Sequence, residues 1–211
     1  VIKYGYPIGA AKEDIQKGQH VHAFNIRTLL SESAEYSYNE EMAKEYVEEF
    51  LLDQKRWEGH VPAIQAYERK DGRIGIRNSL WIAPTVGCVS GIAKKLEAWG
   101  NEPLGIEDGV HAWKHPYGCS QMGDDHENTR KILADLVHHP NAGGVLVLGL
   151  GCENNTMASF KELVGEVDTT RVKFLVAQEC EDEIADSKVL LEEIAAEIRK
   201  DKRTAQPMSK L

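Results

Sequence analysis

The feature that most constrains the fold is a regular alternation, from Tyr67 onward, of short apolar stretches with longer amphipathic ones. The apolar stretches are too short to be buried helices and therefore indicate strands, whereas the amphipathic stretches repeat their apolar residues at helical spacing. This alternation predicts an α/β domain with a mostly parallel sheet, flanked by helices and joined by right-handed crossovers. The predicted strands are 80–83, 110–113, 145–148 and 172–176, and the predicted helices are 90–98, 127–137, 156–163 and 182–200.

The residues before this domain divide into two further segments. Residues 1–30 contain short apolar pieces separated by Pro and Gly, which is typical of the end of a small β-rich module. Residues 31–66 form a linker with a helix over 40–52, whose apolar face should pack against another part of the protein. That face comprises Met42, Ala43, Tyr46, Val47 and Phe50. The α/β domain is assigned to 67–211, and since the chain begins without Met we expect it to be part of a longer protein.

Charge and hydropathy exclude several classes of function. A net charge of −9 argues against nucleic acid and against an anionic membrane surface as partners. The longest apolar stretch, 143–151, is far too short to span a bilayer, and no signal peptide is recognisable. We therefore expect a cytoplasmic protein whose four cysteines are thiols or metal ligands rather than disulfides.

Three of the predicted strands are followed by the same dipeptide, Gly-Cys. The cysteines are Cys88, Cys119 and Cys152. In an open α/β sheet, ligands bind outside the carboxyl ends of the strands, and helices that begin there favour carboxylate or phosphate. Three thiolates with one open position suit a borderline metal, or an iron–sulfur cluster that keeps one iron free for substrate. The alternative is that each Cys is a small residue in a tight turn, as we expect for Cys180, which lacks the preceding Gly.

Histidines and arginines provide further candidates. His20 and His22 alternate along a predicted strand, which would place both imidazoles on one face as half of a metal site or as a solvated pair. His115 precedes the second Gly-Cys loop and is a candidate for proton transfer. A turn at 71–72 would present Arg73 and Arg77 on one side of a short strand, and Arg pairs with carboxylates in a bidentate manner.

Several motifs resemble those of the altronate dehydratase and galactarate dehydratase family of hydro-lyases. They are Tyr67 to Cys88, His115 to His126, His139 to Gly144 and Gly149 to Asn155. The segment from Lys3 to Asn25 resembles the end of the SAF domain that opens these enzymes, although Phe24 stands where the family usually has His. The likeness covers nearly the whole chain and implies that family members continue for about as long again.

The resemblance implies dehydration of a sugar acid, such as D-altronate to 2-dehydro-3-deoxy-D-gluconate in hexuronate catabolism, with Fe²⁺ or Mn²⁺ as cofactor. A related aldaric acid such as galactarate is the alternative substrate, and a homo-oligomer is compatible with the resemblance. On this hypothesis Cys88, Cys119, Cys152, His20 and His22 are candidate metal ligands, and His115, Asp125 and Glu153 handle protons. The substrate-binding candidates are Arg77, Asn78, Thr85, Gly118, Ser120, Gln121, Asn154 and Asn155.

A different class of function stays open at this point. A non-catalytic module that binds a sugar acid would need the same Arg and amide groups but no metal. A dinucleotide-binding domain is disfavoured, because the glycines do not form Gly-x-Gly-x-x-Gly between a strand and a helix.

Overall fold

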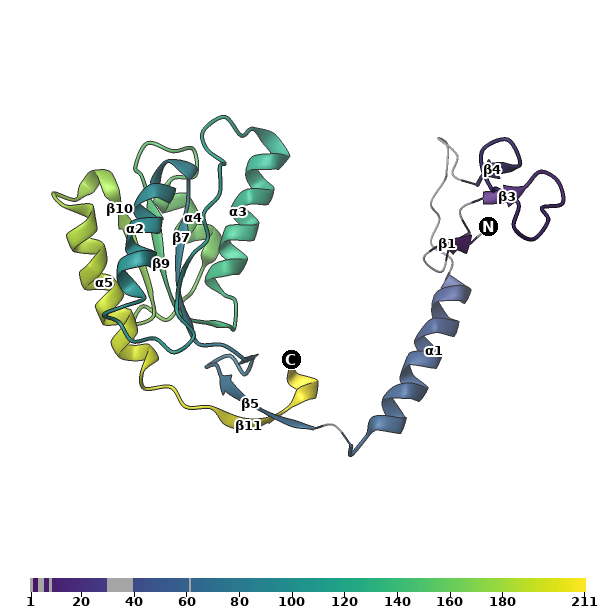
Figure 1. The fold of residues 1–211 in the computed structure, drawn as a ribbon. Helices are drawn as coiled ribbons and strands as arrows, with labels where there is room; N and C mark the ends of the chain where they lie inside the picture. The colour runs from purple at the N-terminus through teal and green to yellow at the C-terminus, as the bar shows by residue number, and fades with distance from the viewer. Residues whose placement is uncertain (1, 4–5, 8, 30–39, 61) are drawn as a thin grey trace. The chain divides into compact units, whose positions relative to one another are not determined.

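The structure, a computed structural model, describes residues 2–3, 6–7, 9–29, 40–60 and 62–211 of the 211. It consists of two compact units, Val1–Glu58 and Gly59–Leu211 (Figure 1). None of the described helices is long and apolar enough to cross a membrane.

The first unit holds two small antiparallel pairs and a helix. β1 (Ile2–Lys3) pairs with β2 (Tyr6–Pro7), and β3 (Gly9–Ala11) pairs with β4 (Ile26–Thr28). The predicted helix is confirmed and runs on to Trp57 as α1 (Glu40–Trp57). Within the described residues Tyr46 is 69% exposed and Phe50 is 63% exposed, so packing of this face against another part of the protein stays a prediction.

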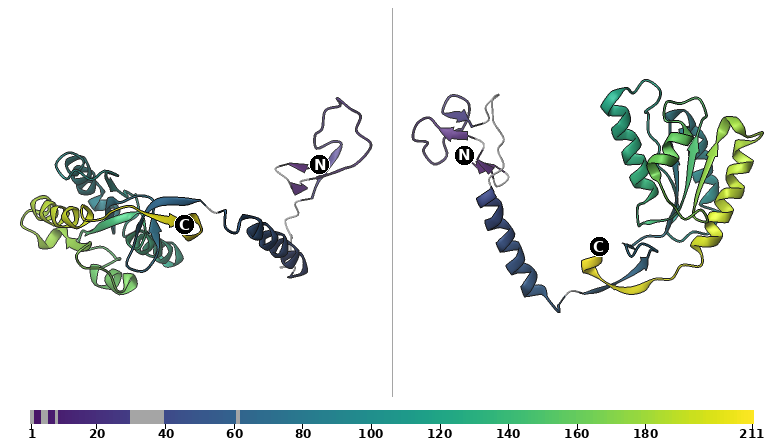
Figure 2. Two further views of the ribbon diagram at one scale, coloured as in Figure 1. Left: turned by 90° about the horizontal axis from the view of Figure 1, so that it is seen from below. Right: turned by 180° about the vertical axis from the view of Figure 1, so that it is seen from behind.

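The second unit is built on a four-stranded parallel sheet, as the alternating pattern predicts. Its strands lie in the order β10-β9-β7-β8 and comprise β7 (Ser79–Pro84), β8 (Val110–Ala112), β9 (Ala142–Gly149) and β10 (Val172–Val176). Four helices cover it, namely α2 (Ser90–Gly100), α3 (Gly123–Val137), α4 (Met157–Val164) and α5 (Glu183–Ile198). Figure 2 shows them on both faces of the sheet.

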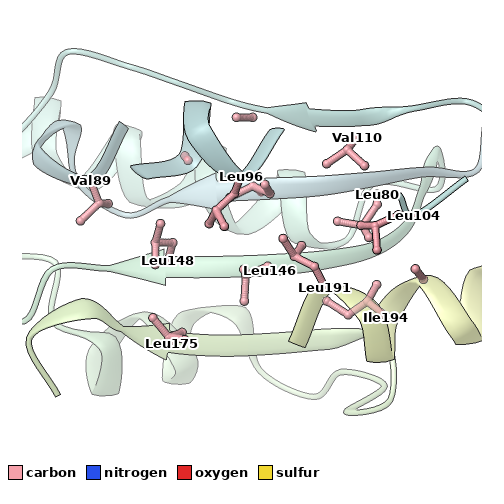
Figure 3. Packing of buried hydrophobic residues seen from close by; sticks show 14 of the residues in the cluster. Leu80, Val89, Leu96, Leu104, Val110, Leu146, Leu148, Leu175, Leu191 and Ile194 are labelled. Carbon is pink, nitrogen blue, oxygen red and sulfur yellow. The ribbon is translucent and has the colours of Figure 1, made fainter. Parts of the chain in front are cut away.

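Alternating side chains of the central strands produce two separate cores. Leu80, Ile82, Leu146 and Leu148 face α2 and α5, and Figure 3 shows Leu191 and Ile194 of α5 packed against this side. Their neighbours in sequence face α3 and α4 instead, where Phe160 is fully buried. Burial of both faces explains why β7 and β9 are nearly continuous apolar runs.

An antiparallel three-stranded sheet, which the sequence did not reveal, adjoins the parallel one. β5 (Ala63–Glu68) lies between β6 (Ile74–Gly75) and β11 (Thr204–Pro207). The predicted turn between β5 and β6 is confirmed, with Gly72 at a φ of 84°. Short 3₁₀ helices at Gly87–Val89, Ala177–Glu179 and Met208–Lys210 complete the unit.

Asp201 connects the two sheets through a pair of half-buried arginines. Its carboxylate accepts two hydrogen bonds from Arg171, of 2.8 and 2.7 Å, and pairs with Arg69 at 3.4 Å. Arg69, which follows β5, also donates to Asn78 Oδ1 and to the carbonyl of Pro140. These bonds hold the carboxyl end of β5 against the amino ends of the parallel strands.

We predict that Asp201→Ala lowers the free energy of unfolding by about 2–3 kcal/mol, because two arginines that are largely shielded from solvent lose their charged acceptor. Urea unfolding followed by circular dichroism would measure the change. The control is Lys200→Ala, which removes a more exposed ion pair with Glu197 and should cost less than about 1 kcal/mol. Equal costs for the two variants would contradict the assigned role of Asp201.

Candidate functional site

The strand order reverses between β7 and β9, and the candidate site lies at that reversal. From β7 the chain moves to β8 on one side, then returns across β7 to place β9 and β10 on the other. The loops that leave the carboxyl ends of β7 and β9 therefore diverge, and a crevice between such loops is where ligands bind in open α/β sheets.

A buried carboxylate spans this reversal. Glu153, 4% exposed, accepts hydrogen bonds from the Thr85 hydroxyl at 2.8 Å and from the backbone N–H groups of Leu150 at 3.0 Å and Gly151 at 2.5 Å. Burial by itself would raise the pKa of Glu153, but the hydrogen bonds from Gly151, Thr85 and Leu150 outweigh it and hold the pKa below the usual value. Glu153 is therefore ionised at neutral pH and joins the loop after β9 to the end of β7.

The three Gly-Cys loops meet, as the sequence predicts for the carboxyl edge of the sheet. Gly87 N–H donates to the carbonyl of Tyr117 at 2.6 Å, and Asn154 Nδ2 donates to the carbonyl of Cys119 at 3.0 Å. A Cβ on Gly87 would lie 2.9 Å from two carbonyl oxygens of the second loop, so this approach requires glycine. Gly151 is required for another reason, its φ of 128°.

A small pocket of about 10 Å³ lies among these loops. Six of its lining residues are among those predicted from the sequence: Thr85, Gly118, Gln121, Glu153, Asn154 and Asn155. Its volume is well below that of a typical ligand site and is close to the space that one water molecule needs. Its lining is rich in hydroxyl and amide groups, which can bind hydroxyl and carboxylate oxygens.

Sequence reasoning missed the contribution of α3. His126, Thr129 and Arg130 line the pocket from one face of this helix. Their spacing of i, i+3 and i+4 is the signal that could have identified them, but the predicted helix began at Glu127, four residues after its true start at Gly123. Val86 and Tyr117, from the loops, are the remaining unpredicted lining residues.

Arg130 holds α3 against the loop that follows β9. Its side chain, 16% exposed, donates from Nε to Asn155 Oδ1 at 3.1 Å and from a terminal nitrogen to the carbonyl of Ser159 at 3.1 Å. The same guanidinium pairs with Glu127 at 3.0 Å. These contacts fix the position of the pocket wall that carries Asn155.

The three thiols do not form the predicted ligand set in this structure. Cys88, Cys119 and Cys152 are exposed and free, and the Cys152 sulfur accepts only a long contact of 3.8 Å from Gln178. Within the parts of the chain that are described, no group of three or more His, Cys, Asp or Glu side chains lies close enough to hold a metal ion. The loops converge, but the donors present here do not fit a metal centre.

Cys180 is partly buried and donates to the carbonyl of Val176, at the end of β10. Burial, followed by the neighbouring Asp186, raises the pKa of its thiol, so the sulfur stays protonated.

His20 and His22 lie in the first unit, and their rings stack at 5.5 Å. They lie in a turn rather than on the predicted strand. The fully buried Asn25 organises this turn, because its side chain accepts from His22 N–H and donates to the carbonyl of His20. Phe24 lies 6.2 Å from both rings and supplies no metal-binding atom.

The remaining predicted residues lie beside or away from the pocket. His115 adjoins it, with Nε2 2.9 Å from the carbonyl of Pro84 and its ring stacked on Tyr117. Asp125 is exposed in the first turn of α3, and Ser120 is exposed in the loop before it.

Arg77 and Asn78 precede β7 and therefore lie at the amino end of the sheet, opposite the pocket. Arg77 pairs with Asp108 at 3.0 Å, whereas the buried Asn78 contacts Arg69, Asp108 and the carbonyl of Ile198. The structure thus gives both residues contacts within the fold and does not bring them to the candidate site.

Comparisons with known proteins agree with this architecture. The family model for the second domain of D-galactarate dehydratase/altronate hydrolase matches residues 66–199, and that for the altronate/galactarate dehydratase SAF domain matches residues 1–29. The chain is 46% identical to an altronate dehydratase of Bacillus subtilis (strain 168) and 45% identical to one of Escherichia coli (strain K12). Each alignment covers 100% of this chain and 41% of the relative, so the chain spans about two fifths of their length. The family resemblance seen in the sequence is therefore confirmed, and the chain belongs to the D-galactarate dehydratase/altronate hydrolase family.

Proposed function

We propose that this chain forms part of a hydro-lyase that removes water from a sugar acid. The observation that carries the proposal is the polar pocket at the strand-order reversal, built from the three Gly-Cys loops and α3. Hydroxyl and amide side chains such as Thr85, Gln121 and Asn154 give it the groups that bind a polyhydroxylated ligand. One face of α3 adds His126, Thr129 and Arg130 to this lining.

The reaction removes the proton on the carbon next to the carboxylate and expels the hydroxyl on the following carbon. Negative charge develops on the carboxylate oxygens as the proton leaves, so preorganised N–H donors around them accelerate the step. Glu153 contributes indirectly, because its carboxylate is already bound by three donors and holds the loops in place. We therefore assign Glu153 a positioning role rather than the proton transfer that the sequence predicted.

The substrate we favour is D-altronate, since both curated relatives are named altronate dehydratase. Galactarate is the second candidate, because the matching family model also covers D-galactarate dehydratase. The four free thiols are compatible with the reducing cytoplasm, where we propose the reaction takes place. A homo-oligomer is compatible with the resemblance, and the exclusion of nucleic acid stays a prediction that rests on the net charge of −9.

The cofactor also stays a prediction of the resemblance. Fe²⁺ or Mn²⁺ would supply a Lewis acid for the departing hydroxyl. Because the described donors do not form a ligand set, we assign no step of the reaction to a metal or to an iron–sulfur cluster.

We predict that the full-length protein converts D-altronate into a 2-keto-3-deoxy acid, detected by a colorimetric assay for such products. The assay would compare a panel of aldonic and aldaric acids, galactarate included, after anaerobic purification with and without added Fe²⁺ or Mn²⁺. Binding of an acid by calorimetry without product under any condition would contradict the hydro-lyase and support a sugar-acid-binding module.

A second prediction concerns the carboxylate at the reversal. Glu153→Gln should reduce turnover and lower the free energy of unfolding by about 1–3 kcal/mol, because the new amide NH₂ would face backbone donors. Glu162→Gln, on the exposed side of α4, is the matched control and should leave both unchanged.

The pH dependence of this difference follows from the lowered pKa of Glu153. A carboxylate whose folded-state pKa lies below its unfolded value of about 4.3 stabilises the fold fully above that value and progressively less as the pH falls. The difference in unfolding free energy between wild type and Glu153→Gln should therefore shrink as the pH is lowered below about 4. A difference that grows in acid would show that the carboxylate is not the stabilising form.

A further inference from the structure

Two buried nitrogen atoms in the wall of the pocket have no hydrogen-bond partner among the residues that the structure describes. They are Asn155 Nδ2 and His126 Nε2. A buried polar atom left unpaired is costly, so such atoms in a pocket indicate that a ligand or a bound water supplies the partner.

The orientation of the Asn155 amide is fixed by its other end. Asn155 is 5% exposed, and its Oδ1 accepts a 3.1 Å hydrogen bond from Arg130 Nε, a group that can only donate. The unpaired atom is therefore the NH₂ group, which requires an oxygen acceptor. In a substrate that combines carboxylate and hydroxyl groups, the carboxylate is the stronger acceptor.

His126 differs from the other titratable side chains that line the pocket. These are Tyr117, Arg130 and Glu153. Glu153 is occupied by three donors, and the Arg130 guanidinium is occupied by Asn155, Ser159 and Glu127. A neutral imidazole has one donor nitrogen and one acceptor nitrogen, which suits it to general acid–base catalysis.

The geometry of His126 is consistent with a proton acceptor. Its side chain is 19% exposed, and Nδ1 lies 3.8 Å from Glu127 Oε1, so the side chain of Glu127 lies on the Nδ1 side of the ring, away from Nε2. With the proton on Nδ1, the buried Nε2 carries the lone pair.

Building on the proposed function, we propose that His126 Nε2 accepts the proton from the carbon next to the substrate carboxylate, while Asn155 Nδ2 donates to that carboxylate. The C–H bond breaks, its electron pair moves onto the carboxylate oxygens, and the proton moves to Nε2. The electron pair then returns to form the carbon–carbon double bond as the bond to the neighbouring hydroxyl breaks, and the proton moves from Nε2 to the departing oxygen as water forms. The resulting enol rearranges to the 2-keto acid, and no oxidant or reductant is consumed.

The test uses the full-length protein with D-altronate and galactarate. We expect His126→Gln to lower kcat by about 10²–10⁴-fold with KM changed less than about threefold, the usual range for loss of a general base. Added imidazole should restore at least a tenth of the lost rate, and exchange of the substrate's C–H with deuterated solvent should stop. Asp124→Asn, an exposed neighbour in the first turn of α3, is the control and should change neither constant.

Asn155 is tested by a variant that keeps its structural contact. Asn155→Asp retains an oxygen for Arg130 but replaces the NH₂ with a second oxygen, so KM should rise by at least tenfold. Asn155→Ala removes both groups, and melting curves for the two variants separate binding from folding.

Two outcomes would overturn the inference while leaving the proposed function intact. In the first, wild type dehydrates a sugar acid and His126→Gln retains more than a tenth of its kcat without any response to imidazole. In the second, Asn155→Asp leaves KM unchanged. If wild type dehydrates no acid of the panel, the proposed function fails, and the proton transfer assigned to His126 fails with it.

Discussion

The ionised carboxylate of Glu153 is the interaction on which the architecture of the site depends. Parallel strands only bring loops to a common edge, and β7 and β9 send theirs in opposite directions. By accepting from Thr85, Leu150 and Gly151, one buried side chain connects the two departing loops. A carboxylate is suited to this task because it accepts several hydrogen bonds at once, and the bonds offset the cost of burying its charge.

Local periodicity was sufficient to predict the strands and helices of the α/β unit, because both faces of its sheet are buried and both cores are strongly patterned. It was insufficient for the antiparallel sheet. β6 has only two residues, and β5 pairs with β11 across nearly the whole unit, as in Ala66 opposite Thr204. Such pairing carries no local signal. The start of α3 was misplaced for a related reason, since Met122 supplies no side-chain cap and Gly123 is a poor helix former.

Convergence of the three Gly-Cys loops was predictable, but the positions of their thiols were not. The parallel sheet determines where a loop begins, whereas the direction of a side chain depends on each turn, and Gly87 and Gly151 serve different geometric needs. The chain direction of β7 explains why Arg77 and Asn78 do not reach the candidate site, because residues that precede β7 lie at its amino end. A motif that spans both ends of a strand, such as Tyr67 to Cys88, therefore contains residues with structural roles at one end and site residues at the other.

The pairing of β5 with β11 has a mechanical consequence. Ala63 lies opposite Pro207, so the segments that lead into and out of this ribbon are neighbours at one end of it. Tension applied through those segments would separate the two strands one residue pair at a time, starting at that end, and would reach Ala66 and Thr204 last. The parallel sheet would bear no load until the ribbon had opened. Force applied through those segments would therefore reach the pocket only after β5 and β11 had separated.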